Sequence, residues 1–154
     1  RGYRFAVPFE VVFPKGLVLV GELGPDNEYQ SREDRAAGKP VRQRVDEATG
    51  LRQWKGTFTD PSAEKERDAS VTVTFLAEVQ PVPTTPELLP GTGMRLAELE
   101  GLRAVPRVVG AGEFKTLGWS FFATGFKASG AAGGSGGGRA AAGKPAEKPD
   151  GKAA

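Results

Sequence analysis

Apolar and polar residues alternate with a period of two over most of this chain, and helical periodicity is nearly absent. Period-two alternation puts every second side chain on one face of an extended strand, which predicts strands with one buried face. Three runs carry the pattern most clearly: Val7, Phe9, Val11 and Phe13; Val71, Val73 and Phe75; and Leu117, Trp119, Phe121 and Ala123. Glycine and proline separate six or seven such runs. This spacing predicts an all-β fold, either a small OB-like barrel or a sandwich.

Three connections between the runs are long or carry helix signals. Residues 24–40 are polar, charged and too long for a tight turn. Residues 60–67 predict one short helix, because an aspartate and a proline stand where an N-cap and a first helical residue would be. Residues 85–89 predict a single helical turn that Pro90 ends.

The last 27 residues differ from the rest in composition. From Ala128 onward the chain has eight glycines, two prolines and no large apolar residue. Such a segment cannot bury enough surface to offset its ordering entropy, so residues 128–154 are predicted to be a disordered Gly/Ala/Lys tail. Residues 1–127 then form one β domain. The tail holds four of the 21 basic and two of the 19 acidic residues, so the domain balances at 17 against 17.

The chain has no cysteine and no histidine. This excludes a disulfide framework and thiolate metal sites, and it removes the residues most often used as nucleophile and general base. No phosphate-binding loop or metal motif is present either, so we expect a protein that is not an enzyme and needs no cofactor and no metal. No run approaches 18 apolar residues, so no membrane span is expected. The lack of cysteine fits the reducing cytoplasm, where we expect the protein to be.

Residues 41–54 predict a β-hairpin that is rich in arginine. Strands 41–46 and 51–59 flank a four-residue loop that ends in Gly50, a position where a positive φ favours glycine. The predicted cross-strand partners are Asp46 and Leu51, Arg44 and Gln53, and Arg42 and Lys55. Directly paired residues share a face, so the hairpin has a basic face and an apolar face. The basic face holds Arg42, Arg44, Gln53, Lys55 and Thr57, and the apolar face holds Val41, Val45, Trp54 and Phe58.

Two interpretations of the basic face are open. Arginines in a row can hold a polyanion, but exposed charge also serves solubility alone. The register matters as well, because a slip of one residue would bring Trp54 beside Arg42 and Arg44 as a stacking platform. The register given above is favoured, because it buries Trp54 with the other apolar residues.

A second group of candidate residues lies in the polar loop. Tyr29 stands there with Arg32 and Arg35, where little else could bury an aromatic ring. Most of the other aromatic residues outside the main runs are expected to pack in or beside the core. They are Tyr3, Phe5, Phe114, Phe122 and Phe126. The candidate nucleic-acid-binding residues are therefore Arg42, Arg44, Arg52, Lys55, Tyr29, Arg32 and Arg35.

An ordered set of short motifs carries a family likeness. They are VFPKG at 12–16, VGE at 20–22, QRVD at 43–46, TGL at 49–51, Trp54, QPVP at 80–83, LEGL at 99–102 and ATG at 123–125. Together they resemble the plasmid replication, integration and excision activator family of actinobacterial integrative elements, over roughly residues 4 to 128. Where that family has a proline after the Thr-Gly-Leu turn, this chain has Arg52. The resemblance implies an accessory protein for replication and excision of a mobile element, and it transfers no catalytic or DNA-contact residue.

Two functions follow as expectations. The first is a nucleic-acid-binding β-barrel that favours single-stranded DNA, since barrels of this kind bind through a sheet face and its flanking loops. The second is a protein-interaction module that docks a replication initiator or recombinase through an edge strand or the proline-rich loop 80–93, without contacting DNA. The sequence is compatible with a homo-oligomer in either case.

Overall fold

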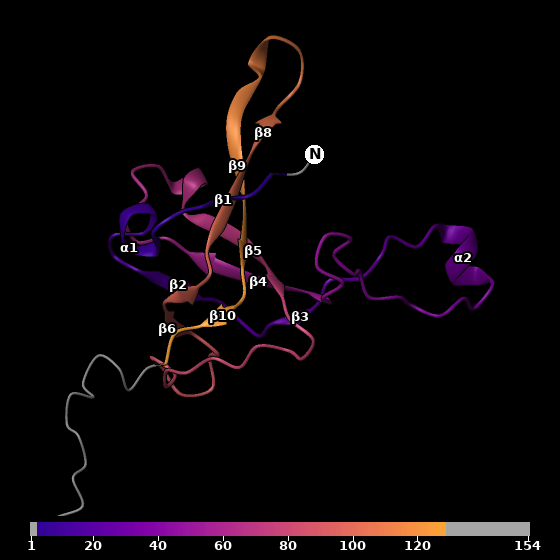
Figure 1. Cartoon of the computed structure of the whole chain (residues 1–154), viewed down its shortest axis with the longest axis horizontal. Coiled ribbons are helices and arrows are strands. Elements are labelled where there is room, and N and C mark those ends of the chain that lie inside the picture. Colours follow the sequence, from indigo (N-terminus) through magenta and orange to yellow (C-terminus); the bar gives the residue numbers. More distant parts are fainter. Residues whose placement is uncertain (1–2, 129–154) are drawn as a thin grey trace, which may run out of the picture.

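The computed structural model describes residues 3–128, and it is built almost entirely of strands (Figure 1). The predicted tail lies outside the described residues apart from Ala128. The strands are β1 Phe5–Ala6, β2 Leu17–Leu19, β3 Gly24–Pro25, β4 Gln53–Thr59, β5 Ser70–Leu76, β6 Arg95–Ala97, β7 Leu99–Glu100, β8 Arg103–Val109, β9 Thr116–Ala123 and β10 Gly125–Phe126. The helical pieces are α1 Phe9–Val12, α2 Arg32–Ala36 and two 3₁₀ turns, η1 Glu66–Asp68 and η2 Gly112–Phe114.

Eight of the strands form one sheet and the other two form a ribbon. The sheet runs β1-β8-β9-β5-β4-β2-β6, with β3 added beside β4, and the ribbon pairs β10 with β7. The pair β5 and β9 is parallel and the other pairs are antiparallel. The prediction of an all-β sheet fold is therefore confirmed. These pairings make an open sheet and a ribbon, so they do not confirm the closed barrel.

The long strands follow the alternation in the sequence. In β5, Val73 and Phe75 are buried while Thr72 and Thr74 lie on the opposite face. All seven residues of β4 pair with those of β5, and Phe58 of β4 is buried on the same side as Phe75. β9 also forms where the pattern predicts a strand.

Aromatic rings and leucines from distant segments make the core. Phe58, Phe75 and Phe126 pack against one another, with the rings of Phe75 and Phe126 stacked at 5.2 Å. Phe13 packs edge-on against Phe121 at 5.2 Å. The largest fully buried side chains are Phe58, Phe75, Leu17, Leu19, Leu99 and Val73.

The predicted strand at Val7 to Phe13 is wrong, because residues 9–12 form α1. Pro8 precedes the turn, and the Phe13 amide donates to the Phe9 carbonyl at 2.8 Å. An alternation over five residues also puts apolar side chains four positions apart, which suits one helical turn. Phe9 and Phe13 are therefore both buried, whereas Val11 is 74% exposed.

The two predicted helical segments, residues 60–67 and 85–89, are wrong as well. The Asp60 side chain accepts hydrogen bonds from the Ser62 amide and hydroxyl, which makes a local turn in place of a helix cap, and only η1 is helical in that connection. Residues 85–89 instead run beside β6, where Glu87 forms a β-bridge with Arg95. This contact covers the outer edge of β6, which would otherwise present unpaired backbone groups.

Two segments project from the sheet, and both matter for the site (Figure 1). One is the hairpin of β8 and β9. The other, here called the arm, is the segment 26–44 that carries α2 at its far end. The arm begins as two facing strands, in which the Glu28 amide donates to Arg42 and the Arg44 amide donates to Asp26, both at 2.8 Å. The arm confirms that residues 24–40 are a long excursion rather than a tight turn.

The turn of the β8–β9 hairpin depends on Gly110. Its φ is +96°, and a Cβ added there would lie 2.3 Å from the Phe114 carbonyl oxygen. We expect Gly110→Ala to destabilise the hairpin end by more than about 1 kcal/mol, since both the φ and the contact disfavour a side chain. Amide hydrogen exchange should accelerate in residues 107–118 and stay unchanged in β4 and β5.

Gly112→Ala is the matched control for this prediction. Gly112 also has a positive φ, of +62°, but an added Cβ there has no heavy atom within 4 Å. Its effect on exchange should therefore be smaller. Equal protection of residues 107–118 in Gly110→Ala and in the wild-type protein would contradict the role given to Gly110.

Candidate nucleic-acid interface

The predicted hairpin forms with the expected register at its turn. The Asp46 amide donates to Leu51 at 2.8 Å and the Gln53 amide donates to Arg44 at 2.9 Å. Val45 and Arg52 form the β-bridge that this register requires. Gly50 closes the loop with a φ of +73°, as predicted for its last position.

The pairing predicted between Arg42 and Lys55 is wrong. Lys55 pairs with Gly24 of β3 on one side and with Thr74 of β5 on the other. Arg42 lies on the arm instead, paired with Glu28. β3 therefore takes the place beside β4 that the prediction gave to residues 41–43.

Because β3 takes this place beside β4, the surroundings of Val41 and Val45 also differ from the prediction. Val41 and Val45 were predicted on a buried face, and both are exposed. Val41 lies on the arm and Val45 lies next to its base, and within residues 3–128 no segment buries either side chain.

Trp54 lies against the core, as the favoured register predicts. Its ring packs on the core cluster, and its Nε1 donates to the Ala77 carbonyl at 2.9 Å. This placement excludes the slipped register in which Trp54 would stack beside Arg42 and Arg44.

A cleft of about 790 Å³ opens where β5 and β9 separate. The two strands pair only at residues 73–75 and 121–123, so their amino-terminal halves are not joined to each other. The cleft is lined from β4, β5, the β8–β9 hairpin, the base of the arm and the turn η1. Its charged residues are Arg44, Lys55, Arg67, Arg107, Asp26 and Asp68, and its hydroxyl side chains are Ser70, Thr72, Thr74, Thr116 and Ser120.

The cleft concentrates positive charge in a domain that is balanced overall. Four basic residues face two acidic ones, and Arg67 lies 4.0 Å from Asp68. Within residues 3–128, no carboxylate lies within ion-pair distance of Arg44, Lys55 or Arg107. Arg44 donates through Nε to the Asn27 carbonyl at 3.2 Å, which holds it at the base of the arm. These three cations are therefore available to a ligand.

Arg44 and Lys55 are thus the two predicted site residues that the fold brings into one cleft. Arg67, Arg107 and Trp119 also line it and were missed by the sequence reasoning. The alternating run of Leu117, Trp119, Phe121 and Ala123 predicts that Trp119 is on a buried face, yet it is 46% exposed. One signal was present, because Pro106 and Arg107 interrupt the apolar pattern of the strand that pairs with Trp119.

The remaining predicted residues lie elsewhere. Arg52 is three positions from Lys55, and residues an odd number of positions apart along a strand lie on opposite faces. Arg52 therefore points away from the cleft face that holds Lys55. Tyr29, Arg32 and Arg35 lie on the arm with Arg42, and Tyr29 is 83% exposed, as expected.

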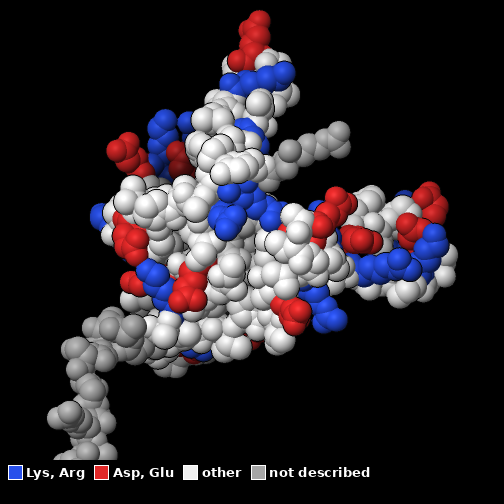
Figure 2. All heavy atoms as spheres, in the orientation of Figure 1, with Lys and Arg blue, Asp and Glu red and all other residues white. Residues whose placement is uncertain are grey.

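Charges on the arm cancel. Residues 28–39 contain three basic and three acidic side chains, and Lys39 pairs with Asp34 at 2.6 Å. Figure 2 shows acidic and basic groups side by side over this part of the surface. A neutral, mixed surface attracts a polyanion less than the cleft does.

The burial of the other aromatic residues differs from the prediction. Phe126 packs against the core and Phe122 is half-buried. Tyr3, Phe5 and Phe114 are exposed, so the expectation that most of this group would pack in or beside the core is wrong. Phe114 lies at the tip of the projecting hairpin, and Phe5 lies in β1 at the edge of the sheet, with Tyr3 two residues before it.

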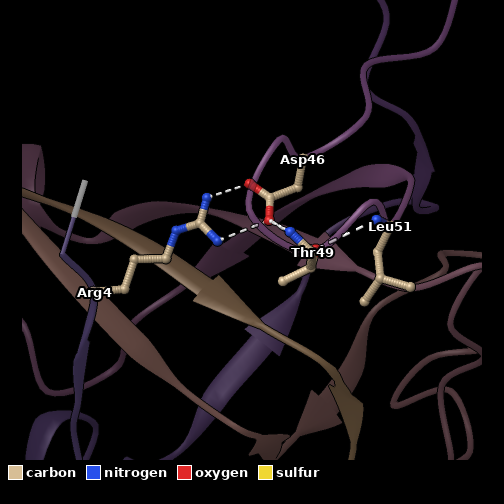
Figure 3. Close-up of polar contacts among 4 residues, drawn as sticks. All are labelled: Arg4, Asp46, Thr49 and Leu51. Carbon is tan, nitrogen blue, oxygen red and sulfur yellow. Dashed lines mark hydrogen bonds and ion pairs between the residues drawn. The ribbon is translucent and has the colours of Figure 1, made fainter. Parts of the chain in front are cut away.

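A buried ion pair lies at the hairpin turn, next to the base of the arm (Figure 3). Asp46 is 4% exposed and accepts hydrogen bonds from both terminal nitrogens of Arg4 and from the amide and hydroxyl of Thr49. The Arg4 guanidinium also lies over the ring of Phe122 at 4.3 Å. The hydrogen bonds from Arg4 lower the pKa of Asp46 to about 2. The N-terminal segment is thereby tied to the hairpin turn two residues from Arg44.

Comparison with protein family models, with curated proteins and with solved structures gives no match. The resemblance to the replication and excision activator family therefore stays a prediction. Within residues 3–128, no cluster of side chains suits a metal ion. In the same part of the chain, no helix has the length and apolar composition that a membrane crossing needs.

Proposed function

We propose that the cleft binds single-stranded nucleic acid, with single-stranded DNA favoured, and that the protein acts by binding rather than catalysis. The observation that carries the proposal is the gathering of Arg44, Lys55 and Arg107 around one cleft in a domain with no net charge. Binding of a polyanion by a neutral domain requires such local clustering.

The order of the strands supports an OB-like barrel. The sequence β2, β4, β5 and β9 along the sheet, with β9 parallel to β5, leaves β6 to β8 as a bent fourth strand. β6 pairs with β2, and β7 pairs with β10, which continues β9 after one residue. We propose that these contacts curl the sheet toward closure.

In that arrangement the cleft occupies the usual binding surface of an OB-fold. OB-folds bind oligonucleotides on the face of the second and third strands, between the loop that joins strands one and two and the loop that joins strands four and five. Here β4 and β5 are the second and third strands, the arm belongs to the first loop, and the tip of the β8–β9 hairpin is the second loop. The cleft is lined from β4, β5 and the base of the arm, and from the strands β8 and β9 that carry this hairpin tip.

The biological setting of the proposal comes from the family resemblance. We propose an accessory protein that acts in the cytoplasm during replication or excision of a plasmid or integrative element. Single-stranded DNA is an intermediate that a protein with this cleft could hold.

Binding to labelled oligonucleotides tests the function. We expect the full chain to bind a single-stranded oligonucleotide more tightly than a duplex of the same length. The logarithm of the binding constant should fall linearly with the logarithm of salt concentration. Lys55→Ala should reduce the slope by about 0.7, the contribution of one phosphate contact on a single strand.

Lys15→Ala is the matched control, because Lys15 is exposed and lines a different pocket. It should leave the salt slope unchanged. Absence of binding to the single strand, or equal binding to the duplex, would contradict the proposed function.

A protein-interaction module is the second candidate function. Exposed apolar side chains lie along the proline-rich segment and β6, among them Val79, Val82, Leu89 and Leu96. Residues 85–88 cover the edge of β6, so a replication initiator or recombinase would meet these side chains rather than a free strand edge. This function is favoured if the oligonucleotides do not bind.

A further inference from the structure

The two tryptophans of the chain have different surroundings. Trp54 packs on the core and its indole N–H is bonded to the Ala77 carbonyl. Trp119 lies on the projecting part of β9, outside the segment 121–123 where that strand pairs with β5. Nearly half of its surface is exposed, and it is one of the residues that line the cleft. Burial therefore explains Trp54 but not Trp119.

The cleft is lined by apolar, hydroxyl and basic side chains. On β9, Leu117, Trp119 and Phe121 follow one another at alternate positions, and Thr116, Gly118 and Ser120 between them line the cleft as well. On β4 and β5, Lys55 pairs directly with Thr74, and Thr72 and Ser70 continue the same face. Arg44 from the base of the arm and Arg107 from β8 add two further cations.

A nucleic-acid single strand offers partners to both the aromatic and the basic side chains of the cleft. Its bases are flat and largely apolar on their faces, whereas its phosphates carry the charge. Aromatic side chains hold unpaired bases by stacking, and basic side chains follow the backbone. A base inside a duplex cannot stack on such an aromatic ring, because both of its faces are already stacked on its neighbours.

We propose that Trp119 is a base-stacking residue of the cleft, and that Arg44, Lys55 and Arg107 contact the phosphates of the same single strand. This inference rests on the proposed function and assigns the base contact within that site. It makes unpaired bases, rather than negative charge alone, the feature that the protein recognises.

An abasic oligonucleotide separates base contacts from phosphate contacts. It has the same length and charge as an oligothymidine but offers nothing to stack. We expect the wild-type chain to bind the oligothymidine about 5- to 150-fold more tightly than the abasic strand, the range for one stacked base. Trp119→Leu should lose that preference while its salt slope stays the same.

Tryptophan fluorescence gives a second readout. Binding of oligothymidine should quench the tryptophan emission of the wild-type protein. It should leave the emission of Trp119→Leu unchanged, because the remaining tryptophan, Trp54, packs on the core. Trp119→Phe keeps an aromatic ring and should keep part of the preference for bases. Thermal unfolding of each variant checks that the fold is intact.

The outcomes are distinct. Loss of the preference in Trp119→Leu, with its salt slope kept, supports the stacking role. Full preference in Trp119→Leu overturns that role and leaves the proposed function in place. A wild-type chain that binds both strands equally also overturns it, since charge alone would then explain binding. A wild-type chain that binds neither strand removes the proposed function together with this inference.

Discussion

Replacing Asp46 with alanine is expected to lower the free energy of unfolding by about 3 to 5 kcal/mol, the usual cost of removing one partner of a buried ion pair. Asp46 is 4% exposed and the Arg4 side chain is largely buried, so the substitution leaves a guanidinium without its counter-charge. It also removes the acceptor of two hydrogen bonds from Thr49. Urea unfolding, followed by circular dichroism, measures the change.

A double-mutant cycle separates the ion pair from the turn. Asp46→Asn keeps an oxygen for Thr49 and removes the charge, so it should destabilise the protein less than the alanine variant. Arg4→Met removes the partner, and the double variant Arg4→Met, Asp46→Asn should cost less than the sum of the two single changes. Additive effects would show that Arg4 and Asp46 do not stabilise each other.

The same ion pair predicts a dependence of stability on pH. Arg4 lowers the pKa of Asp46 from 3.8 to about 2, so the folded state holds this proton less tightly than the unfolded state. The resulting stabilisation, about 2 kcal/mol, is fully present above about pH 4 and is lost as the pH falls toward 2. The wild-type unfolding free energy should decrease over this interval. In Asp46→Asn that part of the decrease should be absent.

Local patterns predicted those parts of the fold in which one face of a strand meets the core. β4, β5 and β9 form where the alternation places them, because Phe58, Phe75 and Phe121 pack against the core from those strands. The pattern was misleading at Phe9 and Phe13, since a spacing of four residues satisfies a helical turn as well as a strand. It was also misleading at Val45, because alternation does not reveal whether anything covers the face it defines.

The candidate site was predictable only where it lies within one hairpin. Arg44 and Lys55 were identified because the turn at Gly50 sets a local register, and that register is observed next to the turn. Arg107 and Trp119 come from a segment 52 to 75 residues further along the chain. They join the site because β5 and β9 pair over three residues and then separate. No local pattern encodes that separation.

Reversing the charge of two cleft residues is expected to have the largest effect on binding. The double variant Arg44→Glu, Lys55→Glu changes the lining from four basic and two acidic residues to two basic and four acidic. Each unit of charge about 4 Å from a phosphate contributes about 1 kcal/mol in water, so four units correspond to roughly a thousandfold loss of affinity. Both side chains are exposed and unpaired with carboxylates within residues 3–128, so the variant should fold normally. Fluorescence anisotropy with a labelled oligothymidine at about 0.1 M salt measures the loss.

The arm provides a control with the same change in net charge. Arg32→Glu, Arg35→Glu alters two residues of α2, at the far end of the arm (Figure 1). Because salt screens charges beyond about 10 Å at 0.1 M, this variant should lose less than about tenfold in affinity. An equal loss in the two variants would mean that net charge, and not the cleft, governs binding. A larger loss in the arm variant would move the site to Tyr29, Arg32 and Arg35, because the bound oligonucleotide would then follow the arm rather than the cleft.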